Sequence, residues 1–166
     1  MAKIESPREL FVHKLGATYK MENTILDMLE ELTEKAQRSD VKQLLQHHRQ
    51  ETQQQVRNLE RAFEALGEEP KGQPCPTIDG IEKDGKTNIK AVDDSLVDNV
   101  ILGGAADTEH HEISTYNGLI MKAENLGEED VAALLRENLE QEEHTLKEVD
   151  LKAREVTRIG AHVRTI

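Results

Sequence analysis

Four long stretches of the sequence repeat apolar residues at alternating spacings of three and four, which is the period of one face of an α-helix. They cover approximately residues 7–37, 40–66, 93–126 and 128–158. A helix with one apolar face is buried only when it packs against other elements, so the pattern predicts an all-α domain. Helices of roughly 27 to 34 residues would each be about 40–50 Å long, as in an extended up-and-down bundle.

Short-range signals predict where the first two helices begin. Ser6 can cap the first helix, Pro7 suits its first turn, and Glu9 can return the capping-box hydrogen bond. Ser39 and Asp40 are expected to interrupt the chain after the first helix and to cap the second. The sequence therefore predicts a tight turn between these two helices.

The middle of the chain has a different composition. Residues 67–92 contain three prolines and four glycines, so this segment is not expected to sustain a long helix, although a short one around 78–83 is allowed. Gly67 and Gly127 are expected to end the helices that precede them. Two tight turns and one long middle connection are typical of ferritin-like bundles. We therefore expect one ferritin-like, up-and-down four-helix domain over residues 1–166, with a long crossover and room in it for a short fifth helix.

Charge and cysteine content exclude several classes of function. The chain has 33 acidic and 21 basic residues and a formal net charge of −12. With no basic stripe to offset this charge, nucleic acids and anionic membrane surfaces are excluded as partners. Cys75 is the only cysteine, so the chain forms no intrachain disulfide and has no paired-cysteine metal site. No stretch resembles a secretory signal or a membrane span, so a cytoplasmic protein is expected.

Glutamates lie on or beside the apolar face of every predicted helix, where aliphatic side chains belong. They are Glu22, Glu51, Glu109, Glu112 and Glu142. Converging buried carboxylates need protons or cations between them, because an unpaired buried charge is costly. A pair of divalent ions bridged by carboxylates meets that need, and iron or manganese accepts oxygen and imidazole ligands. The pattern therefore fits a di-metal site that holds iron or manganese.

Three further residues lie near these glutamates. His48 is three residues before Glu51 and so lies beside it, although di-iron bundles use the reverse order, Glu-x-x-His. Tyr116, one turn from Glu112, could hydrogen-bond a ligand or donate an electron, or be an ordinary core tyrosine. Gln55 is a second candidate for such a supporting contact. The alternative for the whole set is that glutamates at the edge of each apolar face reach solvent.

Two adjacent glycines, Gly103 and Gly104, interrupt the third predicted helix. Each costs about 1 kcal/mol relative to alanine in a helix interior. A glycine at such a position lets another backbone come close. We therefore expect a close helix–helix approach at this point, with a dimer seam as one candidate.

Four segments of the sequence together resemble one bacterial family. They are residues 19–22, 48–52, 109–116 and 142–143. In combination they are similar to the YciE/YciF family of small ferritin-like proteins associated with stress responses, and the similarity extends over nearly the whole chain. The resemblance implies a fold like that of rubrerythrins and bacterioferritins and a di-iron-type site. It implies as ligands Glu22, Glu51, Glu109, Glu112 and Glu142, with His48 as a ligand or an orienting partner.

Two functions of different classes follow from these patterns and from the resemblance, and the association with stress comes from the resemblance alone. The first is a di-metal carboxylate protein that binds iron and acts on dioxygen or peroxide under stress, with ferroxidase or peroxidase turnover as the enzymatic form. The second is a non-enzymatic helical homodimer or interaction module whose metal site is vestigial or absent. Metal binding by the purified protein separates the two hypotheses.

Overall fold

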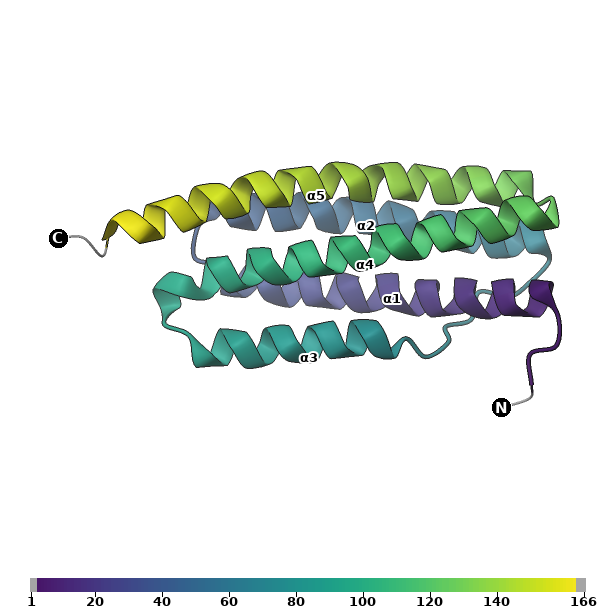
Figure 1. Cartoon of the computed structure of the whole chain (residues 1–166), viewed down its shortest axis with the longest axis horizontal. Coiled ribbons are helices and arrows are strands. Elements are labelled where there is room, and N and C mark those ends of the chain that lie inside the picture. The colour runs from purple at the N-terminus through teal and green to yellow at the C-terminus, as the bar shows by residue number, and fades with distance from the viewer. Residues whose placement is uncertain (1–2, 164–166) are drawn as a thin grey trace.

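The computed structural model describes residues 3–163, which form five α-helices and one short 3₁₀ turn (Figure 1). In chain order these elements are α1 (Pro7–Lys35), α2 (Ser39–Leu66), α3 (Pro76–Ala91), η1 (Asp94–Leu96), α4 (Val97–Leu126) and α5 (Glu129–Val163). The all-α prediction is confirmed for this part of the chain, and α5 continues past its expected end at residue 158. Within the same residues, none of the helices has both the length and the apolar character that a membrane crossing needs.

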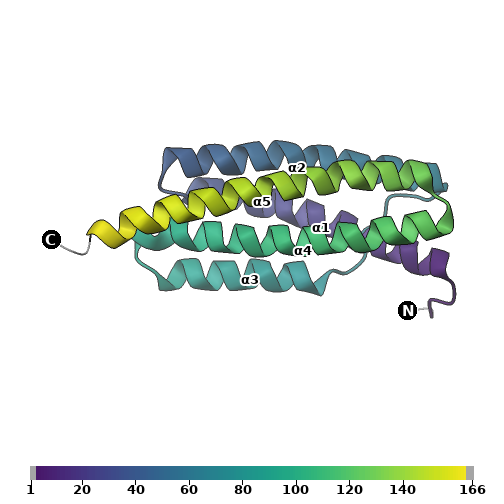
Figure 2. The same ribbon diagram turned by 45° about the horizontal axis from the view of Figure 1, so that its top comes forward.

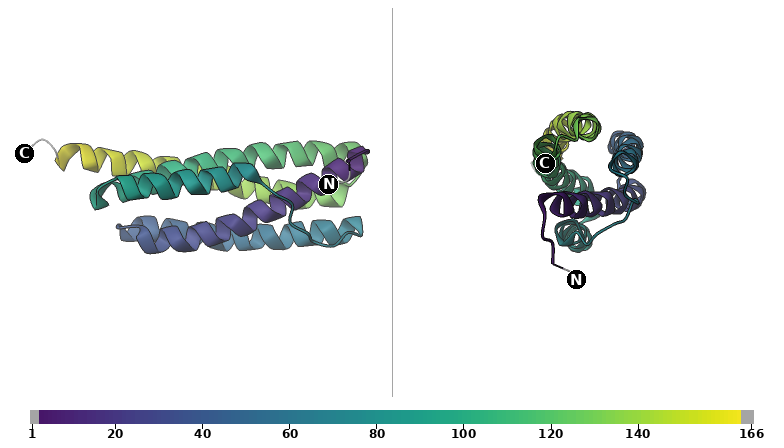
Figure 3. Two further views of the ribbon diagram at one scale, coloured as in Figure 1. Left: turned by 90° about the horizontal axis from the view of Figure 1, so that it is seen from below. Right: turned by 90° about the vertical axis from the view of Figure 1, so that its right-hand side faces the viewer.

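The four long helices form two antiparallel hairpins, α1 with α2 and α4 with α5 (Figures 1 and 2). Helix α2 ends at one end of the bundle and α4 begins at the other, so the connecting chain returns along the length of the bundle (Figure 1). Helix α3 makes most of this return and lies outside the four long helices, against α1 and α4 (Figure 3). The fold is therefore the expected bundle with a long middle crossover.

Helix α3 is longer than the short helix expected around residues 78–83, and the expectation of no long helix in the crossover is wrong for its second half. Pro76 occupies the first turn of α3. Ile78, Ile81 and Ile89 lie at helical spacing and pack against the core. Burial of this face stabilises the helix by more than the helical glycines cost, so tertiary packing overrides local propensity.

The predicted helix ends are found at most positions. Ser6 accepts a hydrogen bond from the N–H of Glu9 at 3.1 Å and caps α1. The Glu9 carboxylate returns its bond to the N–H of Glu5 at 2.8 Å, one residue before the partner that a capping box would give it. Gly67 and Gly127 have φ values of 70° and 74° and end α2 and α4 in the left-handed conformation that glycine adopts readily.

The turn between α1 and α2 is closed by a residue distant in the sequence. Asp98 of α4 accepts hydrogen bonds from the N–H groups of Gln37 at 2.8 Å and Arg38 at 3.0 Å. Ser39 and Asp40 do not cap α2 as expected, because Arg38 occupies the cap position and makes no side-chain cap bond. A buried carboxylate of α4 therefore satisfies free N–H groups of this turn and ties the first hairpin to the second.

Glycine permits one close approach between segments, but not where it was expected. The crossover passes α1 at Gly16, whose carbonyl accepts a hydrogen bond from the N–H of Gln73 at 3.0 Å. A Cβ atom on Gly16 would lie 2.6 Å from the carbonyl oxygen of Lys71. At Gly103 and Gly104 a Cβ atom would meet nothing within 4 Å, so the close approach expected there does not occur among the residues that the structure describes.

The apolar core is divided into two clusters along the bundle. One cluster, near the glycine-terminated ends of α2 and α4, includes Phe11, Leu15, Leu59, Phe63, Leu119 and Leu135. The other, toward the turn between α1 and α2, includes Ile25, Leu29, Leu45, Ile101, Leu102 and Val149. Between the two clusters, the long helices turn a layer of polar side chains inward. The candidate site lies in this layer.

Candidate metal centre

Four ligand-type side chains meet in the buried polar layer. Glu109 and Glu112 are three residues apart and so neighbours on α4, while His48 lies on α2 and Glu142 on α5. Each residue offers one donor atom, and the four atoms lie within 4.8 Å of one another. His48 Nε2 and Glu109 Oε1 are 3.0 Å apart. We call these four residues the ligand cluster.

The donor atoms of the ligand cluster have no hydrogen-bond partners. Both carboxylate oxygens of Glu109, Glu112 and Glu142 and both ring nitrogens of His48 are buried and unpartnered, and the short approach of His48 to Glu109 lacks hydrogen-bond alignment. Buried polar groups are nearly always paired, because an unpaired one keeps its full desolvation cost. Carboxylate and imidazole donors that converge on one point fit a divalent transition metal. The cluster could therefore hold a metal ion.

Burial shifts the acid–base behaviour of the same residues. It raises the pKa of Glu112 well above its ordinary value, and the charges of Glu142 and Glu22 raise it further. Burial, and then the charges of Glu22 and Glu109, likewise raise the pKa of Glu142. For His48, burial acts to lower the pKa, but the carboxylates of Glu109, Glu22 and Glu51 together outweigh it and the net pKa is raised. Without a cation, Glu112, Glu142 and His48 therefore hold protons more tightly than free side chains do, and a bound metal would displace those protons.

Glu22 of α1 lies beside the ligand cluster and is held by a tyrosine. The hydroxyl of Tyr116 donates to Glu22 Oε1 at 2.5 Å, while the other oxygen of Glu22 has no partner. Burial raises the pKa of Glu22 to about 7, although the Tyr116 and Glu112 side chains act to lower it. Glu22 is fully buried, and its unpartnered oxygen lies beside the four donor atoms. Glu22 could therefore act as a further ligand of a bound metal.

Glu51 is the one predicted ligand that the structure places at the edge of the site. Its side chain is 18% exposed, and its Oε1 lies 3.6 Å from Nε2 of the exposed His47. Its other oxygen accepts a hydrogen bond from Thr145 at 3.0 Å, and Thr145 is three residues from Glu142 on α5. The structure therefore brings Glu51 next to the ligand cluster, without including it in the group of four.

The sequence reasoning missed two buried asparagines beside the site. Asn138 Nδ2 donates to the Tyr116 hydroxyl at 3.1 Å and to the carbonyl of Gln55 at 3.2 Å. Asn58 Nδ2 donates to Asn138 Oδ1 at 2.8 Å. Asn138 lies four residues before Glu142, so the spacing that singled out Glu142 could have found it. Gln55 was predicted to make a supporting contact with a metal ligand. It is fully buried, and its side chain acts to lower the pKa of Glu142.

One family profile and one curated relative match nearly all of the chain. The profile of the family described as "Domain of unknown function (DUF892)" matches residues 6–161. Protein YciF of Escherichia coli strain K12 is 28% identical over 153 residues, which cover 90% of this chain and 92% of YciF. The predicted resemblance to the YciE/YciF family is thus confirmed.

Solved structures match the fold over a similar length. YcfI from Rhodopseudomonas palustris has a TM-score of 0.87 at 34% identity, covering 89% of this chain and 95% of YcfI. YciF of E. coli, described as a stress protein, has a TM-score of 0.88 at 25% identity, covering 93% and 99%. A protein from Xanthomonas campestris pv. campestris, 21% identical with a TM-score of 0.76 and coverage of 97% and 100%, resembles this chain in fold alone. The predicted ferritin-like helical fold is confirmed.

Proposed function

The chain belongs to the DUF892 family, and we propose that it is a di-metal carboxylate protein that handles iron together with dioxygen or peroxide in the cytoplasm under stress. The observation that carries the proposal is the ligand cluster, in which four buried side chains converge with unpartnered donor atoms. The stress role rests on the relative YciF, which is described as a stress protein. Iron is the first expectation for the metal, and manganese is the alternative.

Charge balance favours two ions over one. Glu22, Glu109, Glu112 and Glu142 are fully buried and together carry up to four negative charges. Two divalent ions balance these four charges, whereas a single ion would leave half of them uncompensated in a low-dielectric interior. Glu22 on one side of the cluster and Glu51 on another would complete the ligands of the second ion.

The surrounding residues suit such a centre to redox chemistry. Iron bound there would supply the electrons that reduce dioxygen or peroxide. The apolar clusters on both sides keep bulk water from the donors. Tyr116 holds Glu22 in one orientation, and Asn138 in turn holds Tyr116. Turnover of the ferroxidase or peroxidase type is the enzymatic form of the proposal.

Elemental analysis after anaerobic loading with ferrous iron tests the proposal. We expect about two tightly held ions per chain after excess metal is removed. Glu142→Gln should lose them, because it removes a buried donor charge. Glu143→Gln is the matched control, since its side chain is adjacent in sequence but exposed and should leave binding unchanged. A wild-type protein that retains neither iron nor manganese would favour the non-enzymatic interaction module instead.

Stoichiometry tests the places given to Glu22 and Glu51. If each supplies a ligand to the second ion only, Glu22→Gln and Glu51→Gln should each lower the metal content from two ions to one. Glu112→Gln, within the ligand cluster, should lower it further. Full occupancy in Glu51→Gln would instead remove Glu51 from the ligand set and leave it as a partner of Thr145.

The proposal also includes a homodimer. Leu151 and Ile159 of α5 are 70% and 47% exposed, and their spacing places them on one face of the helix. Large apolar side chains exposed together often mark a contact surface. We expect light scattering to give the mass of a dimer, and Leu151→Glu to give a monomer that still binds metal. A monomeric wild-type protein would contradict this part of the proposal.

A further inference from the structure

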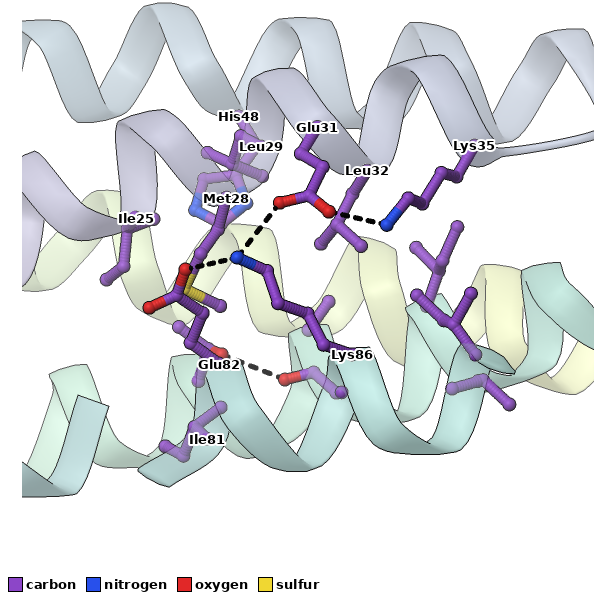
Figure 4. A pocket seen from close by; sticks show the side chains of 17 residues that line it. Ile25, Met28, Leu29, Glu31, Leu32, Lys35, His48, Ile81, Glu82 and Lys86 are labelled. Atoms are coloured by element: carbon purple, nitrogen blue, oxygen red, sulfur yellow. Dashed lines mark hydrogen bonds and ion pairs between the residues drawn. The ribbon is translucent and has the colours of Figure 1, made fainter. Parts of the chain in front are cut away.

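A small apolar cavity lies between α1, α3 and α4, and His48 of the ligand cluster is among the residues that line it (Figure 4). Its volume is about 50 Å³. The walls are predominantly apolar and include Ile25, Met28, Leu29, Ile81, Ile101 and Ala105. His48 also lines the cavity, so one imidazole contacts both the cavity and the carboxylates of the cluster.

The two ends of this cavity differ in polarity. At the surface end, Lys86 Nζ lies 3.1 Å from Glu31 Oε2 and 2.7 Å from Glu82 Oε1, and these side chains are 31–44% exposed (Figure 4). His48, at the other end, is 3% exposed. Thr108 also lines the cavity, and its hydroxyl donates a hydrogen bond to the Gly104 carbonyl at 2.9 Å. A molecule inside therefore meets apolar walls, with ion-paired charges at the surface and His48 at the buried end.

Glycine keeps the cavity open. Gly85 of α3 and Gly104 of α4 line it, and a Cβ atom on either would meet nothing within 4 Å. Gly104 costs about 1 kcal/mol in a helix interior relative to alanine, and no packed neighbour accounts for that cost. The space that a side chain would fill at this position is part of the cavity.

We propose that this cavity is a binding site for dioxygen, through which dioxygen reaches the His48 side of the metal centre. A neutral, apolar, two-atom molecule fits the volume and the walls, whereas an organic substrate is too large for it. Water needs two to four polar partners to occupy a cavity, and cavities lined by aliphatic side chains stay dry and bind apolar gases. Hydrogen peroxide needs the same partners as water, and ferrous ions are charged, so neither fits this route. The inference rests on the proposed function and selects dioxygen as its oxidant.

Dissolved dioxygen is paramagnetic, so methyl NMR of the metal-free protein reports its binding directly. Under oxygen pressure, the methyl groups of Leu29 and Ile101 should relax several-fold faster than those of Leu59 and Leu135, which are buried in the other cluster. Gly104→Leu should abolish the difference by filling the cavity. Gly103→Leu is the matched control, because it adds the same side chain on the exposed side of α4. Equal relaxation at all four residues, or an unchanged difference in Gly104→Leu, would overturn the proposal.

The iron-loaded protein separates failure of this inference from failure of the proposed function. Gly104→Leu should hold as much iron as wild type, react several-fold more slowly with dioxygen and react normally with hydrogen peroxide. Gly103→Leu should match wild type with both oxidants. An unchanged rate with dioxygen in an iron-loaded Gly104→Leu protein would overturn the dioxygen route alone. A wild-type protein that binds no metal would overturn the proposed function and this inference with it.

Discussion

At the scale of single residues, Tyr116 links the candidate site to the rest of the core. Its hydroxyl donates to Glu22 and accepts from Asn138, and Asn138 is held in turn by Asn58. Asn138 is the donor in its hydrogen bond to the Tyr116 hydroxyl, so the hydroxyl hydrogen of Tyr116 is free to point at Glu22. One series of hydrogen bonds therefore joins side chains of four helices, and the Tyr116 hydroxyl is its link between Glu22 and Asn138.

Tyr116→Phe tests the importance of this hydroxyl. It would leave Glu22 Oε1 and Asn138 Nδ2 each short of a buried partner, which costs about 1–3 kcal/mol of unfolding free energy. Tyr19→Phe is the matched control, since the Tyr19 hydroxyl donates to Glu60 at 3.0 Å in a partly exposed position, where water can take the place of the lost hydroxyl. This substitution should lower the unfolding free energy by under about 1 kcal/mol. Urea unfolding of the metal-free variants measures both. Equal losses would show that the Tyr116 hydroxyl has no special structural role.

The periodicity of the sequence was sufficient to predict that most of the site residues point into the bundle. Glu22, Glu109, Glu112 and Glu142 are all completely buried, because their positions match the apolar period of their helices. Periodicity gives the angle of a residue around its own helix, but not which edge residue reaches the centre. Glu51 lies at such an edge, and its partial exposure depends on how α2 packs against α5.

At the scale of elements, local signals predicted the helix ends that depend on local geometry. Ser6, Gly67 and Gly127 act where the sequence placed them. The turn between α1 and α2 escaped this reasoning, because Asp98, some sixty residues away, supplies its hydrogen bonds. Helix α3 escaped it for a related reason, since the burial of its isoleucine face exists only in the folded bundle. Long-range contacts, unlike caps, have no signal in the local sequence.

Gly16→Ala tests the close approach of the crossover to α1. Alanine favours the helix by about 1 kcal/mol, but its Cβ would lie 2.6 Å from the Lys71 carbonyl oxygen, and overpacking typically costs about 1–3 kcal/mol. We expect a lower melting temperature. Gly103→Ala, with no neighbour within 4 Å, should gain the helix propensity alone and raise it. Stabilisation by both substitutions would mean that the crossover is free to move away from α1.

At the scale of the whole molecule, the bundle has a polar layer between two apolar halves. The halves supply the burial that stabilises the fold, and the layer works against it whenever its carboxylates are ionised and unpaired. A bound cation reverses the sign of that contribution, because it binds the folded state and not the unfolded chain. The global stability of the protein should therefore report the state of the site.

The pH dependence of the metal-free protein follows from the raised pKa values in the layer. Glu22 has its pKa raised from 4.5 to about 7 by burial, so between these values the unfolded chain has released a proton that the folded chain keeps. Stability must then fall as pH rises through this window. The raised pKa values of Glu112, Glu142 and His48 act in the same direction. We expect a loss on the order of a few kcal/mol between about pH 5 and pH 8.

Saturating manganese(II) should reverse this slope. Metal binding requires deprotonated ligands, so affinity, and with it the stability added by binding, increases with pH over the same range. Unfolding by urea from pH 5 to pH 8, with and without the ion, measures both curves, which should diverge as pH rises. Glu142→Gln should flatten the metal-free curve, because one titrating carboxyl is removed, and should also abolish the response to manganese. Parallel curves in the wild-type protein would show that the ion does not bind the buried carboxylates, whatever it binds elsewhere on the acidic surface.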